Sequence, residues 1–204
     1  MVDDIRGNRR RKLLIFGQTG DGKSSLCNVL TGSHYDADIF PIDHGATAGT
    51  QETTFANANY IGDPNKLVSI IDTAGFDSSG DDPIGDAESV GELERKLTTK
   101  CDHINLFLMV VNGESPKLKR SLLTMIRTLT KLFSQKFWDH VALVFTRLSM
   151  DNKTMKKRLK NKGGRTDETV AVDYMAEVEQ QFPGKGQHLK YFFIDSCYDM
   201  EDEN

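Results

Sequence analysis

The sequence has few cysteines and no long apolar run, and each absence excludes a class of protein. Cys27, Cys101 and Cys197 are its three cysteines, an odd and widely spaced set that fits neither a disulfide framework nor a zinc site. No stretch approaches the roughly 20 apolar residues that cross a bilayer. We therefore expect a cytoplasmic protein, located on the cytosolic face of a membrane if the full-length protein carries an anchor.

The chain also lacks a strong excess of charge of either sign. Its formal net charge of −4 gives no overall attraction for nucleic acid or for an anionic membrane, so no nucleic acid is expected as a partner. With 204 residues, 38% of them hydrophobic, the chain suits one domain with a sizeable core. We expect a flexible basic leader over residues 1–11, a folded domain over 12–198 and an acidic tail over 199–204.

One stretch has the spacing of a phosphate-binding loop. Residues 17–24 read G-x-x-x-x-G-K-S, between an apolar run at 13–16 and a helical pattern at 23–30. The glycines allow backbone N–H groups to converge on phosphate oxygens. Lys23 supplies a positive charge and Ser24 supplies a hydroxyl for Mg²⁺. Motif and context together predict a strand, a phosphate-binding loop and a helix.

A second motif follows a predicted hairpin. Residues 53–61 and 67–71 are expected to form two strands around a turn at 62–65, and Asp72-Thr73-Ala74-Gly75 comes directly after the second strand. About 50 residues after a phosphate-binding loop, the D-x-x-G spacing becomes informative. It indicates that Asp72 holds Mg²⁺ through water and that the Gly75 N–H reaches the γ-phosphate.

The remaining chain alternates helical and strand patterns, as expected of a parallel α/β sheet. Strands are predicted at 104–111, 141–145 and 191–194, and helices at 87–101, from 115 to 133 and at 168–182. The strand at 141–145 delivers residues 146–151 to its C-terminal end, where ligands bind in such sheets. Segments 33–51 and 76–86 are polar and are expected to be mobile loops.

A basic stretch covers residues 153–165. It could contact an acidic partner or lipid headgroups in a peripheral membrane association, and a solvated helix face explains the pattern equally well. Its seven basic residues are Lys153, Lys156, Lys157, Arg158, Lys160, Lys162 and Arg165.

With these motifs in order, the chain resembles the GIMAP family, immunity-associated P-loop GTPases related to plant avirulence-induced proteins. The resemblance is carried by residues 14–25, Asn28, residues 30–32, 72–77 and 145–147, and it covers nearly the whole chain. It implies an α/β fold: a three-layer P-loop NTPase G domain over 12–198, with a mostly parallel central sheet and helices on both faces.

The resemblance also implies a guanine-nucleotide switch that hydrolyses GTP, with GTP or GDP and Mg²⁺ as cofactors. Lys23, Thr47 and Gly75 would act in catalysis. Mg²⁺ would be held by Ser24, Thr47 and Asp72, with Thr50 as the second choice for the switch threonine. The residues expected to bind the nucleotide are Gly17, Thr19, Gly20, Asp21, Gly22, Lys23, Ser24, Ser25, Thr50, Thr146, Arg147, Asp151, Asp195 and Ser196.

Two positions depart from the usual GTPase pattern. In the base-reading motif N/T-K-x-D, Arg147 replaces the Lys and Ser149 occupies the place of the Asp, so guanine specificity depends on whether Asp151 reaches the base. Phe76 stands where Ras-like enzymes have the Gln that positions the attacking water, and intrinsic hydrolysis is therefore expected to be slow.

The expected partners are a second copy of the chain and a protein effector of unknown identity. The resemblance implies a homodimer in the GTP state, formed through the nucleotide faces, in which turnover could depend on a residue of the partner subunit. Two other functions stay open: a scaffold that binds nucleotide without significant turnover, and a P-loop kinase. The D-x-x-G motif and the lack of an evident Arg-rich lid argue against the kinase.

Overall fold

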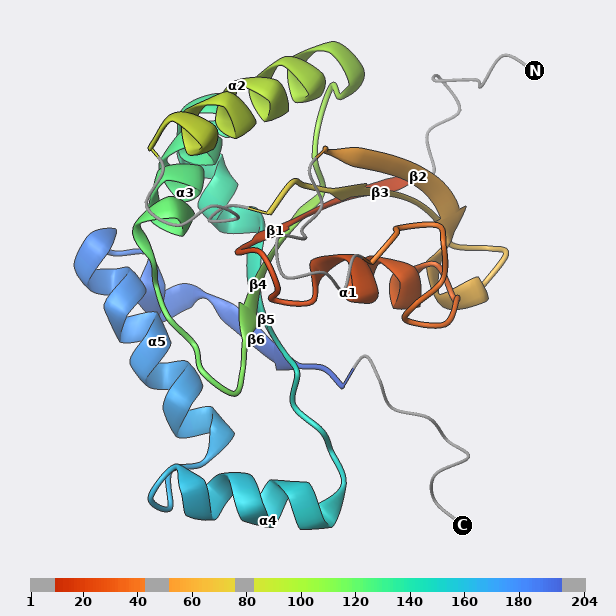
Figure 1. The fold of residues 1–204 in the computed structure, drawn as a ribbon. Helices are drawn as coiled ribbons and strands as arrows, with labels where there is room; N and C mark the ends of the chain where they lie inside the picture. Colours follow the sequence, from red (N-terminus) through yellow and green to blue (C-terminus); the bar gives the residue numbers. More distant parts are fainter. Residues whose placement is uncertain (1–9, 43–51, 76–82, 196–204) are drawn as a thin grey trace.

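Six strands form one sheet that lies between two layers of helices (Figure 1). The computed structural model describes residues 10–42, 52–75 and 83–195, with the side chains of 83–89 left out. The strands are β1 (Arg11–Gly17), β2 (Thr54–Asn59), β3 (Leu67–Asp72), β4 (Leu106–Asn112), β5 (Val141–Thr146) and β6 (Lys190–Phe193). The helices are α1 (Lys23–Leu30), α2 (Pro83–Lys100), α3 (Arg120–Phe133), α4 (Asn152–Asn161) and α5 (Asp167–Gln181). Short 3-10 turns cover Tyr60–Gly62, Gln135–His140 and Gly186–His188.

The strand order in the sheet is β2-β3-β1-β4-β5-β6. Every neighbouring pair is parallel except β2 and β3, which form the antiparallel hairpin expected from the sequence. Central strands of a parallel sheet are covered on both faces, and all six residues of β5 are accordingly buried. Parallel order also brings the carboxyl ends of β1, β3, β4, β5 and β6 to the same edge of the sheet.

The two faces of the sheet bury separate apolar clusters. One face packs against α2, α3 and α5 through residues such as Leu93, Leu122 and Tyr174. The other face packs against α1 through Leu26 and Leu30. The predicted three-layer α/β class is therefore confirmed.

Three predicted boundaries were wrong. Helix α2 begins at Pro83, four residues before the expected start at 87, because proline is well tolerated in the first turn, where its missing N–H has no intrahelical partner. Helix α3 begins at Arg120 and not at 115. The Gln18 side chain donates a 3.3 Å hydrogen bond to the Lys117 carbonyl, which holds the preceding segment beside the phosphate-binding loop. Strand β1 begins at Arg11, one residue inside the expected leader.

Among the helices that the structure describes, none combines the length and the apolar composition needed to span a membrane.

Candidate nucleotide-binding site

The loop between β1 and α1 has a backbone that only glycine allows at several positions. A Cβ at Gly17 would lie 2.4 Å from the carbonyl oxygen of Val110 on the neighbouring strand. Gly20 and Gly22 have φ angles of 81° and 84°, in the left-handed region that favours glycine. Helix α1 then begins directly at Lys23, so its N-terminus with its partial positive charge faces the loop. The predicted strand, loop and helix are confirmed.

Lys23 brings a buried positive charge into this loop. Its side chain is 5% exposed, and Nζ donates a 2.9 Å hydrogen bond to the Gln18 carbonyl. Burial lowers the pKa of Lys23, while the negative charges of Asp72 and Asp21 oppose that shift. A desolvated ammonium group at a helix N-terminus favours an anion such as a phosphate beside it.

Ser24 and Asp72 meet across the site from α1 and from the end of β3. The Ser24 hydroxyl donates a 2.6 Å hydrogen bond to Asp72 Oδ2. The other carboxylate oxygen, Oδ1, is buried and accepts no hydrogen bond from the part of the chain that the structure describes. Burial raises the pKa of Asp72, while the Lys23 charge and the Ser24 hydrogen bond oppose it. Hydroxyl and carboxylate oxygens are the ligands that Mg²⁺ prefers, so these residues fit that ion.

The two sequence motifs lie in direct contact. A Cβ at Gly75 would lie 2.4 Å from Thr19 Oγ1 and 2.9 Å from Thr19 Cα, so the D-x-x-G segment can approach the phosphate-binding loop only with glycine here. Gly75 is buried. The Gly75 backbone thus lies against the phosphate-binding loop, as the predicted contact between its N–H group and the γ-phosphate requires.

Thr146 joins the end of β5 to the phosphate-binding loop. Its fully buried hydroxyl donates to the Asp21 carbonyl at 2.5 Å and lies 3.3 Å from the Val111 carbonyl. The Asp21 carboxylate in turn accepts a 3.2 Å hydrogen bond from the Gln18 N–H. Burial raises the pKa of Asp21 to about 6, although the charges of Lys23, Lys119 and Arg147 oppose this. The Thr146 side chain therefore holds the phosphate-binding loop in place through the loop's Asp21 carbonyl.

The predicted base-reading residues gather after β5 and β6. Arg147 is exposed and has a φ angle of 56°. Asp151 accepts hydrogen bonds from the backbone N–H groups of Lys153 and Thr154, at 3.0 and 2.9 Å, and so caps α4. Asp195 Oδ2 accepts a 3.0 Å hydrogen bond from the Met150 N–H, which places it beside the 146–151 segment.

The Asp151 carboxylate also receives a 2.6 Å hydrogen bond from the Ser149 hydroxyl. This bond, followed by those from Thr154 and Lys153, lowers the pKa of Asp151 and keeps it ionised. The carboxylate is thus engaged within its own loop.

Several predicted site residues lie outside the described ranges. They are Thr47, Thr50, Phe76 and Ser196. The choice between the two switch threonines and the roles of Phe76 and Ser196 therefore stay predictions.

Asn28 has a structural role that sequence reasoning missed, since it entered only through the resemblance. The side chain is fully buried; Nδ2 donates to the carbonyls of Tyr35, Ala37 and Phe40, and Oδ1 accepts from the Phe40 N–H. It thereby fixes the segment that follows α1. The available signal was a polar residue between Cys27 and Leu30 on the apolar side of a short helix.

A glycine loop with a buried lysine at a helix N-terminus, beside a serine–aspartate pair, defines a P-loop nucleotide-binding protein, and the strand order is that of the GTPase fold. The chain belongs to the AIG1 family, whose sequence model matches residues 11–165. The predicted resemblance is thereby confirmed at the level of this family. A search of curated protein sequences finds no match.

Several solved structures share the fold of this chain. The chain is similar to the chloroplast translocon components atToc33 and psToc159, with a TM-score of 0.62 and 14% identity over 93% of this chain and 71% of that chain. Toc33 from Arabidopsis thaliana in complex with GDP and Mg²⁺ gives a TM-score of 0.59 and 15% identity over 93% and 72%. Aquifex aeolicus Era bound to GDP and aluminium fluoride gives 0.56 and 17% over 93% and 52%. At these identities the similarity shows the fold alone.

Proposed function

We propose that this chain is a guanine-nucleotide switch that binds GTP or GDP with Mg²⁺ and hydrolyses GTP slowly. One observation carries the proposal: the Ser24–Asp72 pair lies beside the buried Lys23, and Asp72 keeps a buried oxygen without a hydrogen-bond partner in the described part of the chain. The similar Toc33 structures with GDP or GMPPNP and Mg²⁺ support the choice of ligand.

Each group at the site has a separate task. The N–H groups of the loop and the Lys23 ammonium bind and orient the phosphates. Ser24 and Asp72 would hold Mg²⁺, together with Thr47 or Thr50. The ion would supply positive charge that offsets the negative charge of the phosphates. The Gly75 N–H donates to the γ-phosphate, and its contact with Thr19 sets its position.

We expect Asp151 to give only a weak preference for guanine over adenine. For Asp151 to reach guanine, it would have to release the N-terminal N–H groups of α4, and loss of such a cap costs about 0.5–2 kcal/mol. The charged hydrogen bond that it would gain contributes about 1.5–3 kcal/mol. The difference of about 1 kcal/mol corresponds to a preference for GTP over ATP of roughly tenfold or less.

Slow turnover follows from the residue after the D-x-x-G motif. Phe76 can neither donate to nor accept from a water molecule in the way that Gln does. We infer that association of two copies through their nucleotide faces compensates for this. Dimerization is important for the GTPase activity of the similar proteins atToc33 and psToc159, which supports the inference.

Calorimetric titration of the chain with GTP, GDP and ATP in the presence of Mg²⁺ tests the proposal. We expect GTP and GDP to bind and Lys23→Ala to abolish binding. Asp151→Ala should weaken GTP binding up to about tenfold and leave ATP binding unchanged. Equal affinities for GTP and ATP would defeat the guanine assignment, and no binding at all would defeat the whole proposal.

Single-turnover hydrolysis at high protein concentration then separates the alternatives. Release of inorganic phosphate from GTP supports a GTPase. Stable bound GTP under these conditions would identify a scaffold without turnover. Phosphate transfer to an added acceptor faster than to water would identify a kinase.

A further inference from the structure

Helix α4 presents its apolar residues to solvent and its polar side to the rest of the fold. Met155 and Leu159 are 41% and 42% exposed, whereas the buried residue of this helix is Arg158, at 8%. A surface helix of a globular protein normally buries its apolar residues. Figure 1 shows α4 at the periphery of the fold, away from the sheet and next to the start of α5. Packing of the domain therefore does not explain the outward face of α4.

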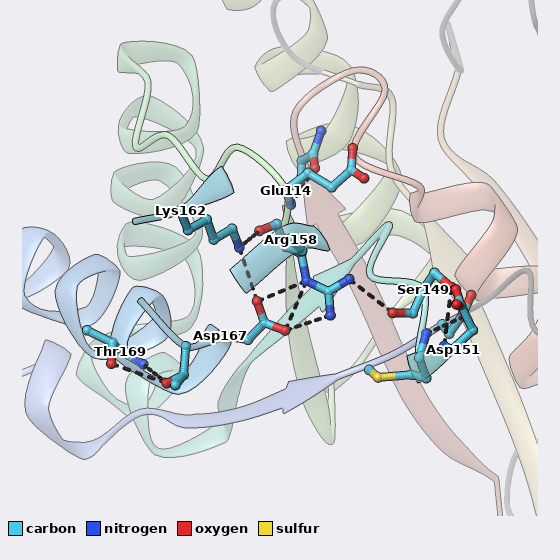
Figure 2. A network of polar contacts seen from close by, with 12 residues as sticks. Glu114, Ser149, Asp151, Arg158, Lys162, Asp167 and Thr169 are labelled. Atoms are coloured by element: carbon cyan, nitrogen blue, oxygen red, sulfur yellow. Dashed lines mark hydrogen bonds and ion pairs between the residues drawn. The ribbon is translucent and has the colours of Figure 1, made fainter. Parts of the chain in front are cut away.

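Polar contacts attach α4 to the fold through its inward side (Figure 2). The Arg158 guanidinium donates to both Asp167 oxygens at 2.7 to 3.1 Å and to the Ser149 carbonyl at 3.0 Å. Lys162 Nζ lies 3.0 Å from the Gly113 carbonyl and 3.1 Å from Asp167 Oδ1. With Asp151 capping its first turn, the helix is held in a defined orientation, so its outward face is a fixed surface.

Four lysines share one side of α4. At 100° per residue these lysines occupy a sector about 100° wide, centred on the side away from Arg158, and Leu159 and Met155 lie about 60° and about 100° beyond one edge of it, towards Arg158. All four are exposed, and none forms an ion pair with the residues placed by the structure. The helix contains no acidic residue. The four are Lys153, Lys156, Lys157 and Lys160.

We propose that this lysine face, the four lysines with Met155 and Leu159 beside them, docks on an anionic membrane surface. The lysines would bind lipid phosphate and carboxylate groups, and the two apolar side chains would enter the boundary between headgroups and acyl chains. Charge complementarity supports this occupant, since each lysine near such a surface contributes about fivefold in affinity.

The apolar pair decides between a membrane and an acidic macromolecule. An acidic peptide or a nucleic acid would match the four lysines but would leave Met155 and Leu159 in water. A bilayer supplies both an anionic layer and an apolar layer within about 5–10 Å of its surface. The chain as a whole has a net charge of −4, so attraction to an anionic surface has to come from a local basic face such as this one, and added salt should weaken it. The proposal does not depend on nucleotide binding.

Co-sedimentation of the full chain with vesicles tests the proposal. We compare phosphatidylcholine vesicles with vesicles that contain about 30 mol% phosphatidylserine. The chain should bind the second kind and lose binding at about 0.5 M salt. The variant K153Q/K156Q/K157Q/K160Q should bind at least about a hundredfold more weakly, and M155S/L159S should bind several-fold more weakly.

A matched variant removes four exposed lysines elsewhere, K66Q/K131Q/K136Q/K190Q, and should bind like the unchanged chain. Circular dichroism and thermal unfolding check that each variant is folded. Equal binding of the chain to both vesicle types would overturn the proposal. So would a matched variant that binds anionic vesicles as weakly as K153Q/K156Q/K157Q/K160Q does. Binding to polyglutamate or RNA but not to anionic vesicles would also overturn it.

Discussion

The buried Asp21 carboxyl group in the phosphate-binding loop makes the stability of the nucleotide-free chain depend on pH. The residue is 8% exposed, and burial raises the pKa of its carboxyl group to about 6 from an ordinary value of 3.8. Between these two values the folded chain binds more protons than the unfolded chain, so this group lowers stability as the pH rises. The effect is complete above a pH of about 6 and absent below a pH of about 4.

We therefore expect Asp21→Asn to stabilise the nucleotide-free chain above pH 6. The amide oxygen can still accept from the Gln18 N–H, while the charge that burial opposes is removed. The gain should be about 1–3 kcal/mol at pH 7.5 and should vanish near pH 4. Urea unfolding at several pH values measures it. Equal stability of the two chains at pH 7.5 would contradict this account.

Asp72 should control the response of nucleotide binding to Mg²⁺. In Asp72→Asn the Ser24 hydroxyl keeps an acceptor, but the carboxylate charge next to the predicted ion is lost. GDP dissociation, followed with a fluorescent analogue, should slow when Mg²⁺ is added to the unchanged chain and stay nearly constant in the variant. Asp63→Asn, at the turn between β2 and β3, serves as the control and should respond fully. A full Mg²⁺ response in Asp72→Asn would exclude this role.

At the scale of elements, the junction of α4 and α5 depends on the pair between Arg158 and Asp167. The Arg158 side chain is 8% exposed and the Asp167 side chain is 20% exposed. Lys162 also contacts this carboxylate. A polar junction of this kind holds α4 in place without burying its apolar residues.

Replacing Arg158 with Met should destabilise the fold by about 2–4 kcal/mol, since Asp167 then keeps a partly buried charge with one cation fewer. The matched change is Arg165→Met. It breaks an ion pair with Asp173 in which both side chains are more than half exposed, and it should cost less than about 1 kcal/mol. Urea unfolding of both variants gives the comparison. Equal losses would mean that the Arg158 pair contributes no more than a surface contact.

At the scale of the whole molecule, the proposed dimer should form only with a nucleoside triphosphate. Sedimentation velocity should give a monomer with GDP and a dimer with a non-hydrolysable GTP analogue. Hydrolysis per chain should rise with protein concentration, because a compensating residue would come from a second copy. A chain that stays monomeric with the analogue and hydrolyses at a constant rate per molecule would argue against this association.

Much of the fold and of the phosphate site could be predicted from the sequence because it depends on local patterns. One short segment contains the apolar run at 13–16, the glycine loop and the apolar spacing in 23–30. A second short segment contains the predicted strand at 67–71 and Asp72, which follows it directly. Apolar periodicity likewise predicted the later strands and the helix at 168–182 to within one or two residues.

The tertiary structure alone decided the features that join distant parts of the chain. Gln18 contacts the segment before α3 at Lys117, 99 residues later in the chain, and Thr146 contacts the phosphate-binding loop at Asp21, 125 residues earlier. The direction of Arg158 follows from the place of Asp167 at the start of α5. Such contacts are set by strand order, which no local pattern encodes. The sequence by itself therefore determined where phosphate and Mg²⁺ are expected to bind, while the tertiary structure decided that Thr146 holds the phosphate-binding loop and that the lysine face points outward.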